Sequence, residues 1–220
     1  MRFWDKKKSG KILKIAIFSL FLLFFCTRIC VYAAENQDFS REEEALEELD
    51  LKDVEIAQRH GYQIKLLGRC LRLEGGHRTA YVAPHLISQE NPVSDVNDVF
   101  NAVVVRGNAT GDVMFCGKGA GELPTASACV ADVMECIQEQ RHRPEIGWSP
   151  DESGFVSPLD LKDRWYFRTD TTLSQQELPH GAQVLESSAG TAFITDYITG
   201  HEAQALKAKL SAPACLRVLD

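Results

Sequence analysis

The stretch YQIKLLGRCLRL, residues 62–73, decides the fold of the chain. Ile64 and Leu66 fall on one side of the chain and Lys65 on the other, which is the two-residue period of a β-strand. The Glu-Gly-Gly-His that follows is a turn sequence, and residues 78–83 are expected to return as the second strand of a hairpin. A β-hairpin is therefore the first element that the sequence predicts.

Elements on both sides of this hairpin can be predicted by the same periodicities. Upstream, Asp50 can cap a helix that runs to His60, with Asp53 three residues further on and Gly61 as the stop. Downstream we expect strands at 100–105 and 113–116, a helix from about 124 to 140, strands at 164–168, 182–186 and 191–198, a helix at 201–210, and a strand at 215–219. The predicted fold class is α+β: a mixed β-sheet with helices on one face, followed by a small β-β-β-α-β module.

Charge is distributed unevenly along the 220 residues. Residues 1–34 carry seven Lys or Arg and one Asp, whereas the remaining residues carry 17 basic and 30 acidic side chains. An acidic body of this kind repels phosphate backbones, so nucleic acid is a poor candidate partner.

The N-terminus has the parts of a secretory signal. Six basic residues precede an apolar run at 15–25, and Val31 and Ala33 stand at the two positions that a signal peptidase reads. The sequence therefore predicts a signal peptide or membrane anchor at 1–34, with a membrane span possible through residues 15–34. Residues 35–49, which are strongly acidic, are expected to form a linker helix. These features predict a membrane or exported location.

A glycine-rich loop follows the predicted strand at 113–116. Gly117, Gly119 and Gly121 precede a helix N-terminus, where glycine lets a ligand or another backbone approach closely and free N–H groups favour an anion. The spacing differs from the dinucleotide fingerprint. From the residues alone, both a structural turn and a ligand contact remain open.

Three motifs together resemble the homoserine dehydrogenase family. They are Gly61-Tyr62-Gln63-Ile64-Lys65-Leu66-Leu67-Gly68, then Val99-Phe100-Asn101-Ala102-Val103, then Gly117-Lys118-Gly119-Ala120-Gly121 with Pro124-Thr125-Ala126. The resemblance implies NAD(P)-dependent interconversion of homoserine and aspartate 4-semialdehyde, on the path to threonine and methionine. It also implies a cofactor contact at Gly121, with Gly119 beside it, a homodimer, and the cytoplasmic location of the family. The family usually has Pro at the position of Lys118.

The resemblance further implies what the chain lacks. The family's N-terminal Rossmann domain, and the segment with its substrate-binding carboxylates and catalytic Lys, are not matched by the first 49 residues. No catalytic residue is therefore assigned, and a complementing Rossmann-domain chain is a possible partner. We expect a catalytic-domain portion at 50–145, a linker at 146–160 and a shortened ACT-like tail at 161–220, in which residues 171–181 replace the first ACT helix.

Two further questions bear on function. The cysteines are scattered, and the spacing of Cys116, Cys129, Cys136 and His142 fits no standard zinc module, so no metal site is predicted. As alternatives to an incomplete dehydrogenase, the chain could be an exported or membrane-tethered binding module without the family's chemistry, or its N-terminus could come from another gene.

Overall fold

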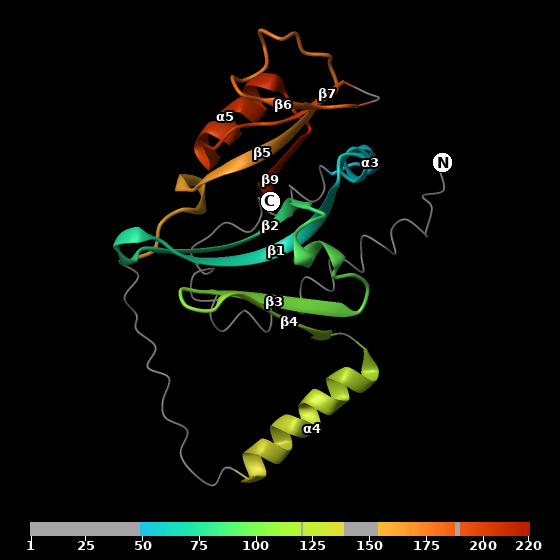
Figure 1. Ribbon diagram of the computed structural model, residues 1–220, viewed down its shortest axis with the longest axis vertical. Coiled ribbons are helices and arrows are strands. Elements are labelled where there is room, and N and C mark those ends of the chain that lie inside the picture. The colour runs from blue at the N-terminus through green and yellow to red at the C-terminus, as the bar shows by residue number, and fades with distance from the viewer. Residues whose placement is uncertain (1–48, 120, 139–153, 188–189) are drawn as a thin grey trace, which may run out of the picture. The chain divides into compact units, whose positions relative to one another are not determined.

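The computed structural model describes residues 49–119, 121–138, 154–187 and 190–220 (Figure 1). The chain divides into two compact units, Met1–Ser94 with Ser153–Asp220 and Asp95–Glu152, and each is described by itself. The predicted leader or anchor at 1–34 lies outside the described residues, as do most of the acidic linker and of the linker at 146–160. Among the residues that are described, no helix has both the length and the apolar character needed to cross a membrane.

The described part of the first unit begins with the predicted helix and hairpin. Helix α3 (Leu51–Arg59) starts at a capping box in which Asp50 and Asp53 each bond the other's backbone N–H. Strand β1 (Tyr62–Arg72) pairs antiparallel with β2 (Arg78–Ser88) along its whole length, across a short 3-10 turn at Glu74–Gly76. β2 is longer than predicted, because it continues through buried residues up to Ser88.

The remaining elements of the first unit extend this hairpin into one sheet. They are two 3-10 turns (Pro92–Asp95 and Pro158–Asp160), β5 (Lys162–Thr169), β6 (Gln183–Leu185), β7 (Thr191–Ile194), β8 (Ile198–Thr199), α5 (Gly200–Leu210) and β9 (Ala214–Leu219). The strand order is β1-β2-β9-β5-β7-β6, with β8 paired to β5. The β2–β9 pair is parallel and the others are antiparallel, so the predicted mixed sheet and α+β class are confirmed.

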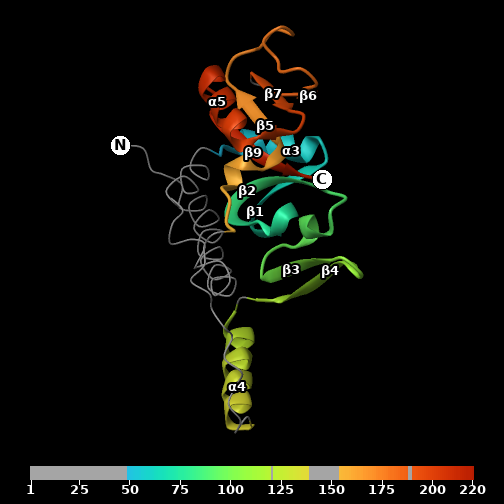
Figure 2. The same ribbon diagram turned by 90° about the vertical axis from the view of Figure 1, so that its left-hand side faces the viewer.

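The sheet buries both of its faces. Tyr166 of β5 packs on one side with Ile56 and Ala57 of α3, whereas Trp165 and Phe167 pack on the other side with α5. Figure 2 shows α3 and α5 on opposite sides of these strands. The prediction of helices on one face was therefore wrong. β5 carries bulky side chains at consecutive positions, so each of its faces needs a cover.

The C-terminal strands do not form a sheet of their own. The predicted β-β-β-α-β order is present, with the third strand divided into β7 and β8, but β9 lies between β2 and β5 and joins all of these strands into one sheet. An ACT-like identity for residues 161–220 stays a prediction, as do the predicted domain boundaries, which do not coincide with the two compact units.

The second unit holds a hairpin and a helix. Strand β3 (Phe100–Gly107) pairs antiparallel with β4 (Gly111–Lys118), and α4 (Glu122–Gln138) follows the glycine loop. All of β4 is exposed, and α4 exposes an apolar stripe formed by Leu123, Val130, Val133, Met134 and Ile137.

Candidate functional site

The register of the β3–β4 hairpin determines where the glycine loop begins. The last ladder pair joins Phe100 to Lys118, and one residue further the Gly119 N–H donates to the Val99 carbonyl at 3.1 Å. The predicted site residues Gly119 and Gly121 therefore lie directly between the end of β4 and the start of α4. Ala120 between them lies outside the described residues.

At Gly119 a neighbouring side chain takes the space that a Cβ would need. A Cβ placed on Gly119 would lie 1.5 Å from Nδ2 of Asn101, far inside contact distance, whereas a Cβ on Gly117 would meet no atom within 4 Å. The sequence motif does not distinguish these two glycines, and the structure does.

Gly121 must be glycine because of its backbone. Its φ is +119°, which side-chain-bearing residues rarely adopt, and its carbonyl accepts from the N–H of Thr125 at 3.1 Å in the first turn of α4. Glu122 follows in that first turn, where an acidic side chain is favourable for the helix dipole. The loop thus turns sharply into the N-terminus of α4.

A buried acid–base cluster lies elsewhere, between α3 and β5. The fully buried carboxylate of Asp53 accepts from Tyr166 Oη at 2.9 Å and from Arg168 Nε and Nη2 at 2.7 and 3.1 Å. Burial, followed by the charge of Asp53, raises the pKa of Tyr166 above its usual value. No substrate reaches groups this deep, so we assign the cluster to packing.

A second polar cluster lies on the opposite face of the sheet. Arg217 is stacked between the rings of Trp165 and Tyr81, with its guanidinium carbon 4.5 and 4.8 Å from their centroids, and it donates to Asp163. His85 stacks on Tyr81, is fully buried, and donates from Nδ1 to the Ala83 carbonyl. Burial lowers the pKa of His85 to about 3, so the ring is neutral at physiological pH.

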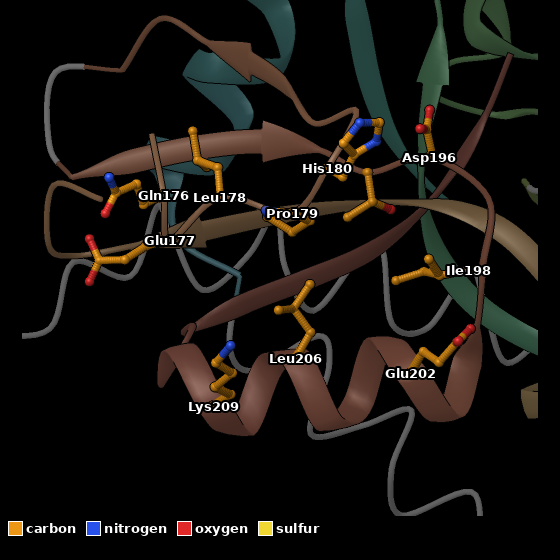
Figure 3. Close-up of a pocket in the computed structure, with 11 residues that line it drawn as sticks. Gln176, Glu177, Leu178, Pro179, His180, Asp196, Ile198, Glu202, Leu206 and Lys209 are labelled. Carbon is orange, nitrogen blue, oxygen red and sulfur yellow. The ribbon is translucent and has the colours of Figure 1, made fainter. Parts of the chain in front are cut away.

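The C-terminal part of the chain contains a pocket of about 360 Å³ between α5 and the loop before β6. In Figure 3, Leu206 of α5 extends toward Pro179 of this loop, and His180 and Asp196 lie near each other at one end. The Glu177 carboxylate accepts hydrogen bonds from the backbone N–H and the hydroxyl of Ser174. The Glu202 carboxylate accepts from the backbone N–H of Thr199 in the capping box of α5. Five of its lining residues, 176–180, belong to the segment 171–181 that was predicted to replace the first ACT helix, and sequence reasoning did not single out a cavity there.

Within the described ranges, no three His, Cys, Asp or Glu side chains come together as a metal site. Of the cysteines imagined as zinc ligands, Cys116, Cys129 and Cys136 are exposed, and His142 lies outside these ranges.

The sequence matches the homoserine dehydrogenase family model over residues 23–134, slightly more than half of the chain. The chain belongs to the homoserine dehydrogenase family. The matched region contains α3, the hairpins and the glycine loop, and it begins within the apolar run at 15–25, ahead of the predicted boundary at residue 50. The alternative of a binding module unrelated to the family's chemistry is not favoured.

Curated homoserine dehydrogenases are similar to part of the chain. The Lactococcus lactis enzyme is 36% identical over 130 residues, which cover 57% of this chain and 30% of the relative, and the Pseudomonas aeruginosa enzyme is 40% identical over 102 residues, which cover 46% and 23%. The chain thus spans about a third or less of the length of these relatives.

Solved homoserine dehydrogenase structures extend the likeness beyond the family match. The Thiobacillus denitrificans structure superimposes with a TM-score of 0.62 at 24% identity and covers 78% of this chain and 46% of that one. A Staphylococcus aureus structure gives 0.56 at 27% identity and covers 77% and 44%. The likeness supports the fold of the C-terminal part as well.

Proposed function

We propose that the chain serves as the substrate and dimerisation region of a homoserine dehydrogenase, working together with a nucleotide-binding domain in the NAD(P)-dependent interconversion of L-homoserine and L-aspartate 4-semialdehyde. The observation that carries the proposal is the glycine loop, where Gly119 follows the end of β4 and Gly121, at φ +119°, precedes the start of α4. In the family this loop contacts the nicotinamide cofactor.

The residues present fit only part of what the reaction needs. The cofactor would supply the hydride chemistry, and Gly119 and Gly121 would be the residues that contact it. Hydride transfer also requires a group that accepts the hydroxyl proton within hydrogen-bond reach. Lys52, Lys65 and Lys118 do not match the family's catalytic position, so we assign none of them as the proton acceptor.

The test is an assay of homoserine-dependent NADP reduction. The purified chain alone should show none, because cofactor positioning and proton transfer each contribute large factors to the rate. Mixing it with the part of the Lactococcus lactis enzyme that the match does not cover should restore measurable reduction, whereas that part alone should not. Turnover by the chain alone, or no turnover by the mixture in which binding is verified, would contradict the proposal.

We also propose that the second unit supports a homodimer. Homoserine dehydrogenases are generally dimers, and the β3–β4 hairpin exposes apolar side chains on both faces. One face holds Val103, Val105, Val113 and Phe115, and the other holds Phe100, Val104 and Met114. A two-stranded hairpin is only marginally stable by itself, so cover by a second copy is expected.

For the C-terminal part we propose a divergent ACT-type tail whose main role is to complete the sheet. The order of its elements and its likeness to dehydrogenase structures support this. We assign no amino-acid response to it, because residues 171–181 do not form the first ACT helix.

A further inference from the structure

One side chain in the strand FNAVVV, residues 100–105, departs from its apolar character. Asn is disfavoured in β-strands, and Asn101 stands next to Phe100 in a strand that is otherwise apolar up to Val105. Oδ1 of Asn101 is buried and accepts no hydrogen bond in the described part of the chain. An unpartnered buried amide oxygen costs about 1–3 kcal/mol, so its presence calls for a compensating role.

The side-chain amide of Asn101 lies next to Gly119. A Cβ on Gly119 would lie 1.5 Å from Asn101 Nδ2, 2.5 Å from Cγ and 3.1 Å from Cβ, so the Asn101 side chain occupies the volume that any residue at position 119 would need. On the other side, the Gly119 N–H is held by the Val99 carbonyl. Gly119 is thus held by two contacts, one with Asn101 of β3 and one with Val99, the residue before this strand.

We propose that Asn101 is a positioning residue for the glycine loop: its amide packs against Gly119 and sets the point at which the chain leaves β4 toward α4. The consequence for nicotinamide binding rests on the proposed function, whereas the positioning itself is a property of the chain alone. Asn101 touches no reacting atom in this assignment, and acts through the backbone of Gly119 and Gly121.

Hydrogen exchange of the Gly119 amide in the full chain, labelled with ¹⁵N, tests the positioning. In Asn101→Ala this amide should exchange at least about tenfold faster, because the loop loses one of its two restraints. Amides of Val103 and Val105 within the ladder should keep their protection. Gly117→Ala is the matched control and should leave the loop unchanged, since a Cβ there meets nothing within 4 Å.

A second single variant and a double variant distinguish a positioning role of Asn101 from a general loss of folded structure. Gly119→Ala should also lose protection at residue 119, because its methyl and the Asn101 amide need the same space. Combining it with Asn101→Ala should recover most of the protection, because the new methyl occupies the vacated volume. Unchanged exchange in either single variant, or no recovery in the double variant with an intact hairpin ladder, would overturn the proposal. Asn101→Ser serves in place of Asn101→Ala if the latter does not fold.

A separate readout addresses the cofactor. NADPH added to the chain together with the complementing nucleotide-binding domain should shift the amide resonance of Gly121 in the wild type, and should bind at least tenfold more weakly with Asn101→Ala. If NADPH shifted no resonance in the wild type, the proposed cofactor contact would be wrong. The positioning of Gly119 by Asn101, which the exchange experiment tests, would be unaffected. A shift with equal affinity in both proteins would show that Asn101 does not position the loop for the cofactor.

Discussion

The carboxylate of Asp53 contributes to the fold through two interactions, one within α3 and one with Arg168. It closes the capping box of α3, and the same carboxylate neutralises Arg168, whose side chain is only 4% exposed. A buried ion pair adds little stability compared with an apolar pair, but removing one partner leaves a charge without compensation. Asp53 thus joins α3 to the C-terminal strands.

Replacing this carboxylate should be costly. We expect Asp53→Asn to lower the free energy of unfolding by about 3 kcal/mol, because Arg168 would keep a buried charge with a weaker partner. Urea denaturation followed by the fluorescence of Trp165 measures the loss. Asp170→Asn removes the exposed second partner of Arg168 and should cost less than about 1 kcal/mol. Equal losses in the two variants would show that burial does not determine the effect.

His85 should make folding stability sensitive to acid. Its pKa is about 3 in the folded chain and near 6.5 when unfolded, so the unfolded state binds more protons between these values. Stability is therefore unaffected by His85 above about pH 7 and falls as the pH drops through 6.5 toward 3. At pH 5 the loss should be about 2 kcal/mol.

The positive charges facing His85 act in the same direction. Arg69 of β1 and Arg217 of β9 both lower its pKa, and the Ala83 carbonyl opposes them. His85→Leu should remove most of the difference in unfolding free energy between pH 7 and pH 5, measured by urea titration. His180→Gln, at an exposed histidine, should leave that difference unchanged, and a similar reduction by both variants would count against the assignment.

The β3–β4 hairpin is largely exposed. Phe115 is 64% exposed, at the centre of the face that also holds Val103. Phe115→Glu should convert the expected dimer to monomer at micromolar concentration, because a charge in an apolar interface is expensive to bury. Light scattering measures the mass. Thr110→Glu adds the same charge at the exposed turn and should leave the dimer intact, and a wild-type monomer throughout this range would refute the interface.

Most elements could be predicted from local sequence, and their assembly could not. The capping residues of α3 and the alternation around Ile64 are local signals, and the structure confirms both elements. The pairing of β2 with β9 joins residues more than 100 positions apart, and no local pattern encodes it. The predicted strand at 191–198 is interrupted at Thr195, whose hydroxyl accepts from the Trp165 N–H. Sequence spacing does not reveal such a contact.

The glycine loop, too, could be predicted only in part from the sequence. Its place between a strand and a helix follows from the motif, and Gly119 and Gly121 do lie there. Which glycines are sterically required depends on Asn101 and on one backbone angle, and both are tertiary properties. The cofactor contact itself stays a prediction.

At the scale of the whole molecule, the start of the family match bears on how the N-terminus is processed. The family match starts at residue 23, inside the apolar run and ahead of the predicted cut after Ala33. We therefore expect mass spectrometry of the fractionated protein to find residues 23–33 in the mature chain. A mature N-terminus near Ala34 outside the cytoplasm would instead establish a cleaved signal, and uncleaved protein in the membrane fraction would establish an anchor.

The position of β9 constrains how the protein can be made. Ala214–Leu219 lies between β2 and β5, so it is an interior strand of the sheet although it is translated last among the elements. While the ribosome is still delivering these residues, β1–β2 and β5–β7 are separate hairpins with unpaired edges, which a chaperone or a second nascent chain could occupy. The sheet can close only after residue 219 has left the exit tunnel.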